Sequence, residues 1–357
     1  MNKNVSRRSF VTGATGAGAL AALAGLAGCN QKKDDGGQKA SGEKKKKLTM
    51  VTDTGGVNDQ SFNQSAWEGM TELKDKNGWD VSYLESKQDS DYATNLDKAV
   101  DAESDLVWGI GFAMADAVVK AAKDNANTQF AIIDNANDSE VANLTGVMFR
   151  AQEPSFVVGY IAARTSKTGK VGFVGGISSA LIDQFEYGYR GGVAYANKEN
   201  NTNVEISAQY AESFSDAAKG KAIANSMYSD GCDVVFHAAG GVGTGVIEAA
   251  KDANKLAIGV DRDQAYLAPE NVLTSALKRV NVAIIEISEK ILKDGKKGGD
   301  TISLGATDDA VGIAEDHHLM SDDTYKAALD LFDKIKAGSV VPPASKDDLD
   351  KYTKTLS

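Results

Sequence analysis

After Lys47, short runs rich in β-branched and aromatic residues alternate with helical stretches. The first group comprises strands expected at 48–52, 81–84, 106–110, 130–133 and 144–149, with helices near 61–77, 91–103 and 113–125. The pattern then starts again, with strands expected at 171–174, 204–210, 234–237, 257–260 and 272–276 and helices near 183–197, 214–229 and 243–253. A strand repeatedly followed by a helix indicates a parallel sheet with helices on both faces. The sequence therefore predicts two similar α/β lobes in tandem.

The first 29 residues have the character of an export signal. A paired arginine, Arg7-Arg8, precedes an uncharged Ala/Gly-rich run at 11–27, and the run ends at Gly28-Cys29. A paired arginine before a weakly apolar segment resembles a twin-arginine signal, and small residues before a cysteine resemble a lipoprotein cleavage site. A membrane-spanning helix is the weaker alternative, because the run is short of the roughly 20 apolar residues that a span needs. We expect export, cleavage before Cys29 and an extracytoplasmic protein anchored to the cell membrane by lipid on that cysteine.

Residues 30–47 are polar and cannot bury enough apolar surface to order themselves, which predicts a disordered tether. The four lysines at 44–47 either lie near anionic lipid headgroups or belong to a merely solvated linker. The remainder, about 310 residues, exceeds a typical single core, so two domains are expected.

Charge and cysteine content exclude some classes of protein. A formal net charge of -11 argues against a nucleic-acid partner, because phosphate binding needs a basic face. With Cys29 assigned to the anchor, Cys232 has no partner and no disulfide framework is expected. Cys232 begins an apolar run and is interpreted as a small core residue, with a reactive thiol as the less favoured alternative.

Polar and aromatic residues follow several of the predicted strands. They are Asp53, Asp134, the pair Phe236-His237 with Gly240-Gly241 after it, and Asp261. Ligands of open α/β sheets bind at the carboxyl ends of the strands, so two facing lobes would bring these loops together. Each aspartate alone would be an ordinary capping residue, whereas the set together indicates a ligand cleft.

The segment 51–64 is the richest in candidate chemistry. Gly55-Gly56 allows a tight turn, Asp59 or Ser61 can cap the next helix, and Phe62-Asn63 then lie in its first turn. An aromatic face beside an amide suits a flat ligand that forms hydrogen bonds.

This segment resembles the opening of the basic membrane protein family of substrate-binding lipoproteins, relatives of the purine-nucleoside receptor lipoproteins of bacterial ABC importers. Further stretches resemble that family in the same order: 130–134, 153–160, 170–176, 234–241, 259–264 and 273–279. The resemblance implies a type I periplasmic-binding-protein fold, in which two Rossmann-like lobes with parallel sheets are joined by three crossovers and close on a nucleoside. On this basis lobe 1 is expected at 48–150 plus 277–305, and lobe 2 at 151–276 plus 306–357.

The resemblance also implies roles for individual residues. It places the base between Phe62 and Phe236, and the ribose at Asp261 and Lys278 beside the backbone amides of Gly240 and Gly241. The polar edge of the base would lie near three further residues, Asp53, Asn63 and Asp134. Stacking on an aromatic ring and acceptance from a vicinal diol by a carboxylate are physically suited to these roles. Val242 and Thr244 stand where relatives often carry Thr and Asn, which leaves the sugar contacts of that loop open.

No arrangement typical of catalysis is recognisable. The three histidines, His237, His317 and His318, lack zinc-ligand spacing, and no Gly-x-Ser-x-Gly elbow is present. We therefore expect no enzyme activity, cofactor or metal, but a monomeric receptor that passes a nucleoside, a purine in the leading interpretation, to an ABC permease driven by ATPase subunits. The alternatives are a pentose or hexose receptor of the same fold, an anchored hydrolase or nucleoside-cleaving enzyme, and a structural surface antigen.

Overall fold

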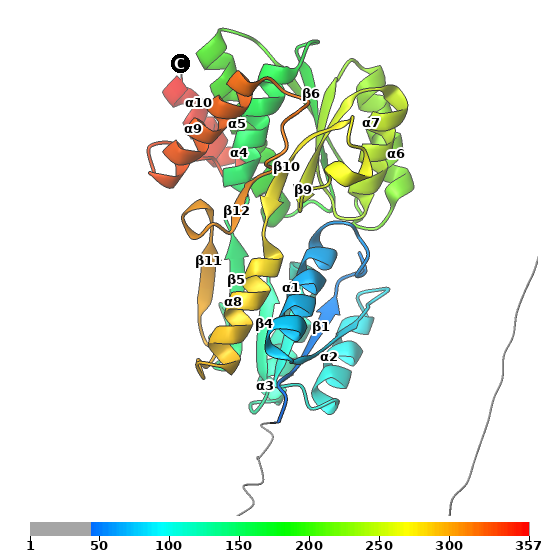
Figure 1. The fold of residues 1–357 in the computed structure, drawn as a ribbon, viewed down its shortest axis with the longest axis vertical. Coiled ribbons are helices and arrows are strands. Elements are labelled where there is room, and N and C mark those ends of the chain that lie inside the picture. The colour runs from blue at the N-terminus through cyan, green and yellow to red at the C-terminus, as the bar shows by residue number, and fades with distance from the viewer. Residues whose placement is uncertain (1–43, 357) are drawn as a thin grey trace, which may run out of the picture. The chain divides into compact units, whose positions relative to one another are not determined.

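The computed structural model describes residues 44–356, which contain two six-stranded sheets (Figure 1). The first has the order β11-β5-β4-β3-β1-β2 and every neighbouring pair is parallel. Its strands are β1 (Lys47–Thr52), β2 (Asp80–Leu84), β3 (Leu106–Ile110), β4 (Gln129–Ile133), β5 (Leu144–Phe149) and β11 (Thr301–Leu304). The second has the order β12-β10-β9-β8-β6-β7, and only β12 is antiparallel to its neighbour. Its strands are β6 (Lys170–Gly175), β7 (Glu205–Tyr210), β8 (Val234–Ala238), β9 (Leu256–Asp261), β10 (Val272–Lys278) and β12 (Val311–Ile313).

Helices cover both sheets, because the strands are apolar on both faces. The first sheet is accompanied by α1 (Phe62–Asn77), α2 (Asp91–Asp101), the 3₁₀ turn η1 (Phe112–Met114), α3 (Ala115–Asp124) and α8 (Val280–Leu292). The second is accompanied by α4 (Gln152–Thr165), α5 (Ala180–Asn200), α6 (Ala217–Ser229), α7 (Val242–Ala253), η2 (Ala265–Leu267), α9 (Asp322–Lys336) and α10 (Lys346–Leu356). Helix α1 packs beside α8, α4 beside α5, and α6 beside α7.

The chain passes between the two sheets three times: from β5 to α4, from β10 to α8, and from β11 through η3 (Ala306–Asp308) to β12. Hydrogen bonds tie these crossing segments together. The amide of Arg150 donates to Leu304 O at 2.8 Å, and the amide of Arg279 donates to Ala310 O at 2.8 Å. Because the first and the second crossing segments are both hydrogen-bonded to the third, the three segments form one connection rather than separate linkers.

The predicted fold class is confirmed. The expected elements are present with shifted ends, and the structure adds helices α4, α8, α9 and α10 and strands β11 and β12, which were not among the expected elements. The first strand includes Lys47, which the sequence assigned to the tether. Helix α6 begins at Ala217 because Asp216 caps it, accepting from the amide of Lys219 at 3.0 Å. Strand β10 continues to Lys278, two residues beyond its predicted end.

The predicted export signal with Arg7-Arg8, the lipidation site Cys29 and most of the tether lie outside the described residues. Within residues 44–356, no helix has the length and apolar character needed to cross a membrane. Cys232 is buried and unpaired, as expected for a core residue.

Candidate ligand-binding site

Two aspartates end corresponding strands of the two sheets. Asp134 follows β4 and Asp261 is the last residue of β9, and each strand is the third in its sheet order. Both residues have φ of 65°, a left-handed conformation that aspartate tolerates better than most residues. Both carboxylates are buried, with Asp134 5% and Asp261 7% exposed. The same backbone conformation thus places one buried acidic side chain at the carboxyl end of a strand in each sheet.

A cavity with about 520 Å³ of empty space, counting the part open to solvent, lies where the strand ends of the two sheets meet. It is lined by Asp53, Gly55, Asp59, Phe62, Asn63, Gly111, Phe112, Asp134, Leu181, Ile182, Phe185, Phe214, Ala238, Ala239, Gly240, Val260, Asp261 and Lys278. The lining residues come from both halves of the sequence. Each sheet with its accompanying helices forms one domain, so a molecule in the cavity contacts both domains.

Most of the residues singled out from the sequence line this cavity. They are Asp53, Phe62, Asn63, Asp134, Gly240, Asp261 and Lys278. Gly241 is not among the lining residues, although it follows Gly240 directly and begins the turn into α7.

Phe236 does not line the cavity, which corrects the expected pairing of Phe62 with Phe236. It is completely buried in the middle of β8, and its ring centroid lies 5.6 Å from that of Phe173 and 5.3 Å from that of Tyr189. The physical reason is its place in the strand: two residues before the carboxyl end, its side chain packs into the core between β6 and α5.

Three lining aromatics were missed by the sequence reasoning: Phe112, Phe185 and Phe214. Phe112 and Phe214 meet edge to face, with centroids 6.3 Å apart and planes at 82°. Phe112 follows β3 and Phe214 lies in the loop after β7, so each comes from a different sheet. Position after a strand, the signal that singled out the aspartates, would have found both. The longer helix expected at 214–229 placed Phe214 inside a helix instead.

The loop from β1 to α1 is shaped by carboxylates. Asp53 Oδ1 accepts from the amide of Gly55 and from Asn63 Nδ2, both at 2.8 Å. Asp59 caps α1, accepting from the amides of Ser61 at 2.9 Å, Asn63 at 2.8 Å and Gln64 at 3.1 Å. Of the two expected caps, Asp59 is therefore the one used.

The hydroxyl of Ser61 serves a different purpose. It donates to Asp261 Oδ2, which joins the β1–α1 loop of the first sheet to the end of β9 in the second. Nearby, Gln264 Nε2 donates to the carbonyl of Gln60 at 3.0 Å, and Gln264 Oε1 accepts from the amide of Val260 at 2.9 Å.

Lys278 is the only cationic residue among those lining the cavity, against four aspartates. Its ammonium donates to Asp134 Oδ2 and lies 4.6 Å from the ring centroid of Phe62 and 5.1 Å from that of Phe149. An ammonium over an aromatic face is attracted by the ring's negative charge density. This arrangement fixes Lys278, which is 2% exposed, between the two sheets.

Burial dominates the acidity of the lining carboxyls. It raises the pKa of Asp261 to about 6, although Lys278 and the Ser61 hydroxyl partly oppose the shift. Burial likewise raises the pKa of Asp53 to about 6, against the hydrogen bonds from Asn63 and Gly55. Burial thus disfavours the ionised form of both carboxyls, and N–H or O–H donors of a bound ligand would stabilise that form.

No group of three or more His, Cys, Asp or Glu side chains among residues 44–356 is arranged to hold a metal ion. His237 is not among the residues that line the cavity; it is completely buried, with Nε2 3.0 Å from Gln264 Oε1. Burial lowers the pKa of His237 to about 4, so its imidazole is neutral at physiological pH.

Comparisons with known proteins agree with this geometry. A profile of the family described as ABC transporter substrate-binding protein PnrA-like matches residues 46–346. Basic membrane protein A of Borreliella burgdorferi is 40% identical, covering 89% of this chain and 94% of that protein. The ABC transporter nucleoside-binding protein BmpA of Lactococcus lactis is also 40% identical, covering 80% of this chain and 87% of that protein. A solved ABC transporter solute-binding protein of Aeropyrum pernix has a TM-score of 0.80 at 26% identity, covering 87% of this chain and 97% of that one.

Proposed function

The chain belongs to the PnrA-like family of ABC transporter substrate-binding proteins, and from that premise we propose that it binds a purine nucleoside and delivers it to an ABC importer. A substrate-binding component is not an enzyme, which accords with a cavity that combines hydrogen-bond acceptors and aromatic rings. The nucleoside-binding relative of Lactococcus lactis, similar over most of its length, supports the choice of ligand.

The observation that carries the proposal is the pairing of aromatic walls with buried acceptors in one cavity. Phe62 and Phe214 come from opposite sheets' domains and are the rings we assign to the base, with Phe214 in the place first given to Phe236. Asp53, Asn63 and Asp134 face its polar edge. Stacking contributes about 1–3 kcal/mol per base, judged from proteins that bind single-stranded nucleic acids.

The ribose is assigned to Asp261 and Lys278, next to the backbone of Gly240. A carboxylate accepts from both hydroxyls of a vicinal diol, and an ammonium donates to ribose oxygens. Because the assigned groups come from both sheets' domains, only a closed form makes the full set of contacts, and the ligand stabilises that form. A permease can then distinguish a loaded receptor from an empty one by its shape.

Native mass spectrometry of freshly purified protein tests the proposal directly. We expect a retained small molecule with the mass of a purine nucleoside, displaced by added guanosine or inosine and not by glucose or free ribose. A retained sugar, or displacement by glucose or ribose at concentrations where guanosine has no effect, would establish the pentose or hexose receptor instead. Free base appearing on incubation with inosine would show nucleoside cleavage.

We also propose that the mature protein is an extracytoplasmic monomer tethered by lipid on Cys29 after twin-arginine export. The paired Arg7-Arg8 and the small residues before Cys29 support this. Metabolic labelling with a fatty acid tests it: label should enter the wild type and not a Cys29→Ala variant. Export that persists in an Arg7→Lys, Arg8→Lys variant would contradict the twin-arginine route.

A further inference from the structure

Two side-chain atoms among the cavity's lining residues are buried and have no hydrogen-bond partner: Asn63 Oδ1 and Asp134 Oδ1. Both are acceptors, and their residues are 1% and 5% exposed. A buried acceptor without a partner is costly, so both atoms are suited to a ligand that brings donors.

The orientation of the Asn63 amide has a visible cause. Its Nδ2 donates to Asp53 Oδ1 at 2.8 Å and to Asp59 Oδ2 at 3.1 Å, so both amide hydrogens are directed at carboxylates. Turning the amide over would place its oxygen against two carboxylate oxygens, which repel it. The two carboxylates therefore leave Oδ1 as the atom without a partner.

The backbone allows this cluster to form. A side chain at Gly55 would place its Cβ 3.0 Å from Asp53 Oδ1 and 3.1 Å from Asn63 Nδ2, closer than ordinary contacts. Asp59 is held in turn by three backbone amides at the start of α1, so its carboxylate cannot turn away from Asn63.

From these contacts we infer that Asp59 is a positioning residue, which together with Asp53 holds the Asn63 amide in one orientation. In that orientation Asn63 and Asp134 present only hydrogen-bond acceptors to the ligand. The site therefore selects nucleosides whose base carries N–H donors. The inference rests on the proposed nucleoside binding. Guanosine and inosine satisfy the requirement, because their six-membered rings carry N–H groups. Purine riboside has the same ring and sugar but no N–H donor on its base.

The test measures the affinity of guanosine and of purine riboside by calorimetry. In the wild type we expect guanosine to bind at least about 10-fold more tightly, because purine riboside leaves buried acceptors unpaired. Asp59→Asn keeps one capping oxygen but can place an NH₂ group where Asn63 Nδ2 now donates, which loosens the lock because Asp53 alone then holds the amide. Guanosine affinity should then fall while purine riboside affinity changes little, so that the ratio shrinks to about 3-fold or less.

Ser61→Ala is the matched control. It removes the hydrogen bond to Asp261, on the side assigned to the ribose, and should weaken both ligands equally without changing their ratio. If Asp59→Asn does not fold, Asn63→Ala serves instead and should also reduce the ratio. A folded Asp59→Asn protein that keeps the wild-type ratio would overturn the positioning role while leaving nucleoside binding intact. A wild type that binds neither nucleoside would overturn both proposals together.

Discussion

At the scale of single residues, Asp261 combines the binding role proposed for it with a cost in stability. Its pKa in the folded protein is about 6, raised from 3.8 by burial, so the folded state holds a proton that the unfolded state releases between pH 4 and 6. The stabilisation from that proton is fully present below pH 4 and is lost as the pH rises through 6. At pH 7 the ionised carboxylate thus opposes folding of the ligand-free protein.

Asp261→Asn should consequently make the ligand-free protein more stable at pH 7. The difference between a pKa of 3.8 and one of about 6 corresponds to roughly 3 kcal/mol, an upper value because an asparagine replaces the acceptor of the Ser61 hydroxyl imperfectly. Urea unfolding of both proteins at pH 4, 5, 6 and 7 measures it: the difference should grow from near zero at pH 4 to its maximum at pH 7. A difference that does not depend on pH would contradict the assigned pKa. The variant should also lose nucleoside affinity.

Two phenylalanines that accompany the second sheet, Phe214 in the loop after β7 and Phe236 within β8, separate binding from packing. Phe214→Ala should weaken guanosine binding by about 1–3 kcal/mol, since it removes a stacking surface, with little effect on unfolding. Phe236→Ala removes a core ring and should lower the free energy of unfolding by about 3–5 kcal/mol while affinity in the folded fraction stays near that of the wild type. Calorimetry and denaturant titration of both variants distinguish the two roles. The opposite pattern would restore Phe236 as the stacking residue.

At the scale of elements, the start of α6 places Phe214 in the cavity. Asp216 accepts from the amide of Lys219, so the helix begins at Ala217 and leaves the preceding loop free to reach the site. In the same loop, the amides of Ser215 and Asp216 both donate to the hydroxyl of Ser213 at 3.1 Å. Helix capping thus determines the conformation of a loop that contributes Phe214 to the lining of the cavity.

Asp216→Ala should cost about 1 kcal/mol of stability, because an alanine cannot accept from the amide of Lys219, whereas Asp216→Asn caps nearly as well and should cost a few tenths. Asp216→Ala should also weaken guanosine binding, since the loop that carries Phe214 into the cavity is then no longer held in one conformation. Denaturant unfolding and calorimetry on the two variants provide the comparison. Equal losses in both would show that the charge, and not the cap, is what matters.

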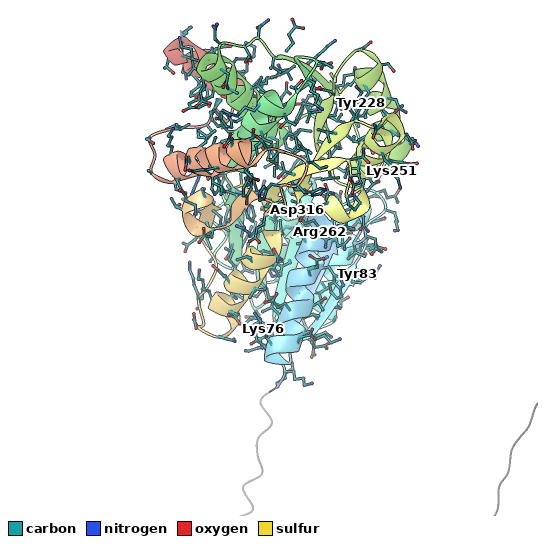
Figure 2. All side chains as sticks on the ribbon, turned by 45° about the horizontal axis from the view of Figure 1, so that its top comes forward. Lys76, Tyr83, Tyr228, Lys251, Arg262 and Asp316 are labelled. Carbon is teal, nitrogen blue, oxygen red and sulfur yellow. The ribbon has the colours of Figure 1, made fainter. Side chains whose placement is uncertain are left out.

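At the scale of the whole molecule, the sheets' domains are joined by contacts outside the cavity as well as by its lining. Arg262, after β9, pairs with Glu68 of α1 at 2.5 Å, and Tyr266 donates to Gln60 Oε1 at 2.7 Å; Arg262 lies where the two parts meet (Figure 2). Such partly exposed pairs contribute about 0–1 kcal/mol, and they form only when the domains are together.

Removal of the Arg262–Glu68 pair should therefore speed ligand release. Arg262→Ala is expected to raise the dissociation rate of guanosine up to about 5-fold, equally for every nucleoside, since the pair does not line the cavity. Lys76→Ala, which breaks a pair with Glu72 within α1, is the control and should leave the rate unchanged. Stopped-flow measurement of the dissociation rate in both variants tests this prediction. An effect on the release of one nucleoside alone would argue that Arg262 contacts that nucleoside directly.

Closure also predicts how parts of the ligand behave. Guanine and ribose should each bind on the order of 100-fold more weakly than guanosine, because guanine lacks the diol assigned to Asp261 and Lys278, and ribose lacks the base assigned to Phe62 and Phe214. Titration of guanosine, guanine, ribose and a hexose under one set of conditions measures this. A ribose or hexose affinity equal to guanosine's would favour the sugar receptor.

The amino-acid sequence by itself determined the alternation of strands and helices, the parallel sheets and most of the polar lining. These follow from local rules: apolar runs form buried strands, and a polar residue directly after such a strand lies at the ligand edge wherever the strand is placed. Asp53, Asp134 and Asp261 could be predicted in this way because each lies directly next to its strand in the sequence.

Only the tertiary structure decided which side chains on one face of a strand reach the cavity and which distant side chains combine. Phe236 and Ala238 lie on the same face of β8, yet Phe236 packs against Tyr189 in the core, whereas Ala238, at the carboxyl end of the strand, lines the cavity. The contacts of Lys278 with Asp134 and of Ser61 with Asp261 join residues 144 and 200 positions apart. Pairings of this kind carry no local signal, because they depend on how two separately folded sheets are brought together by the three crossing segments.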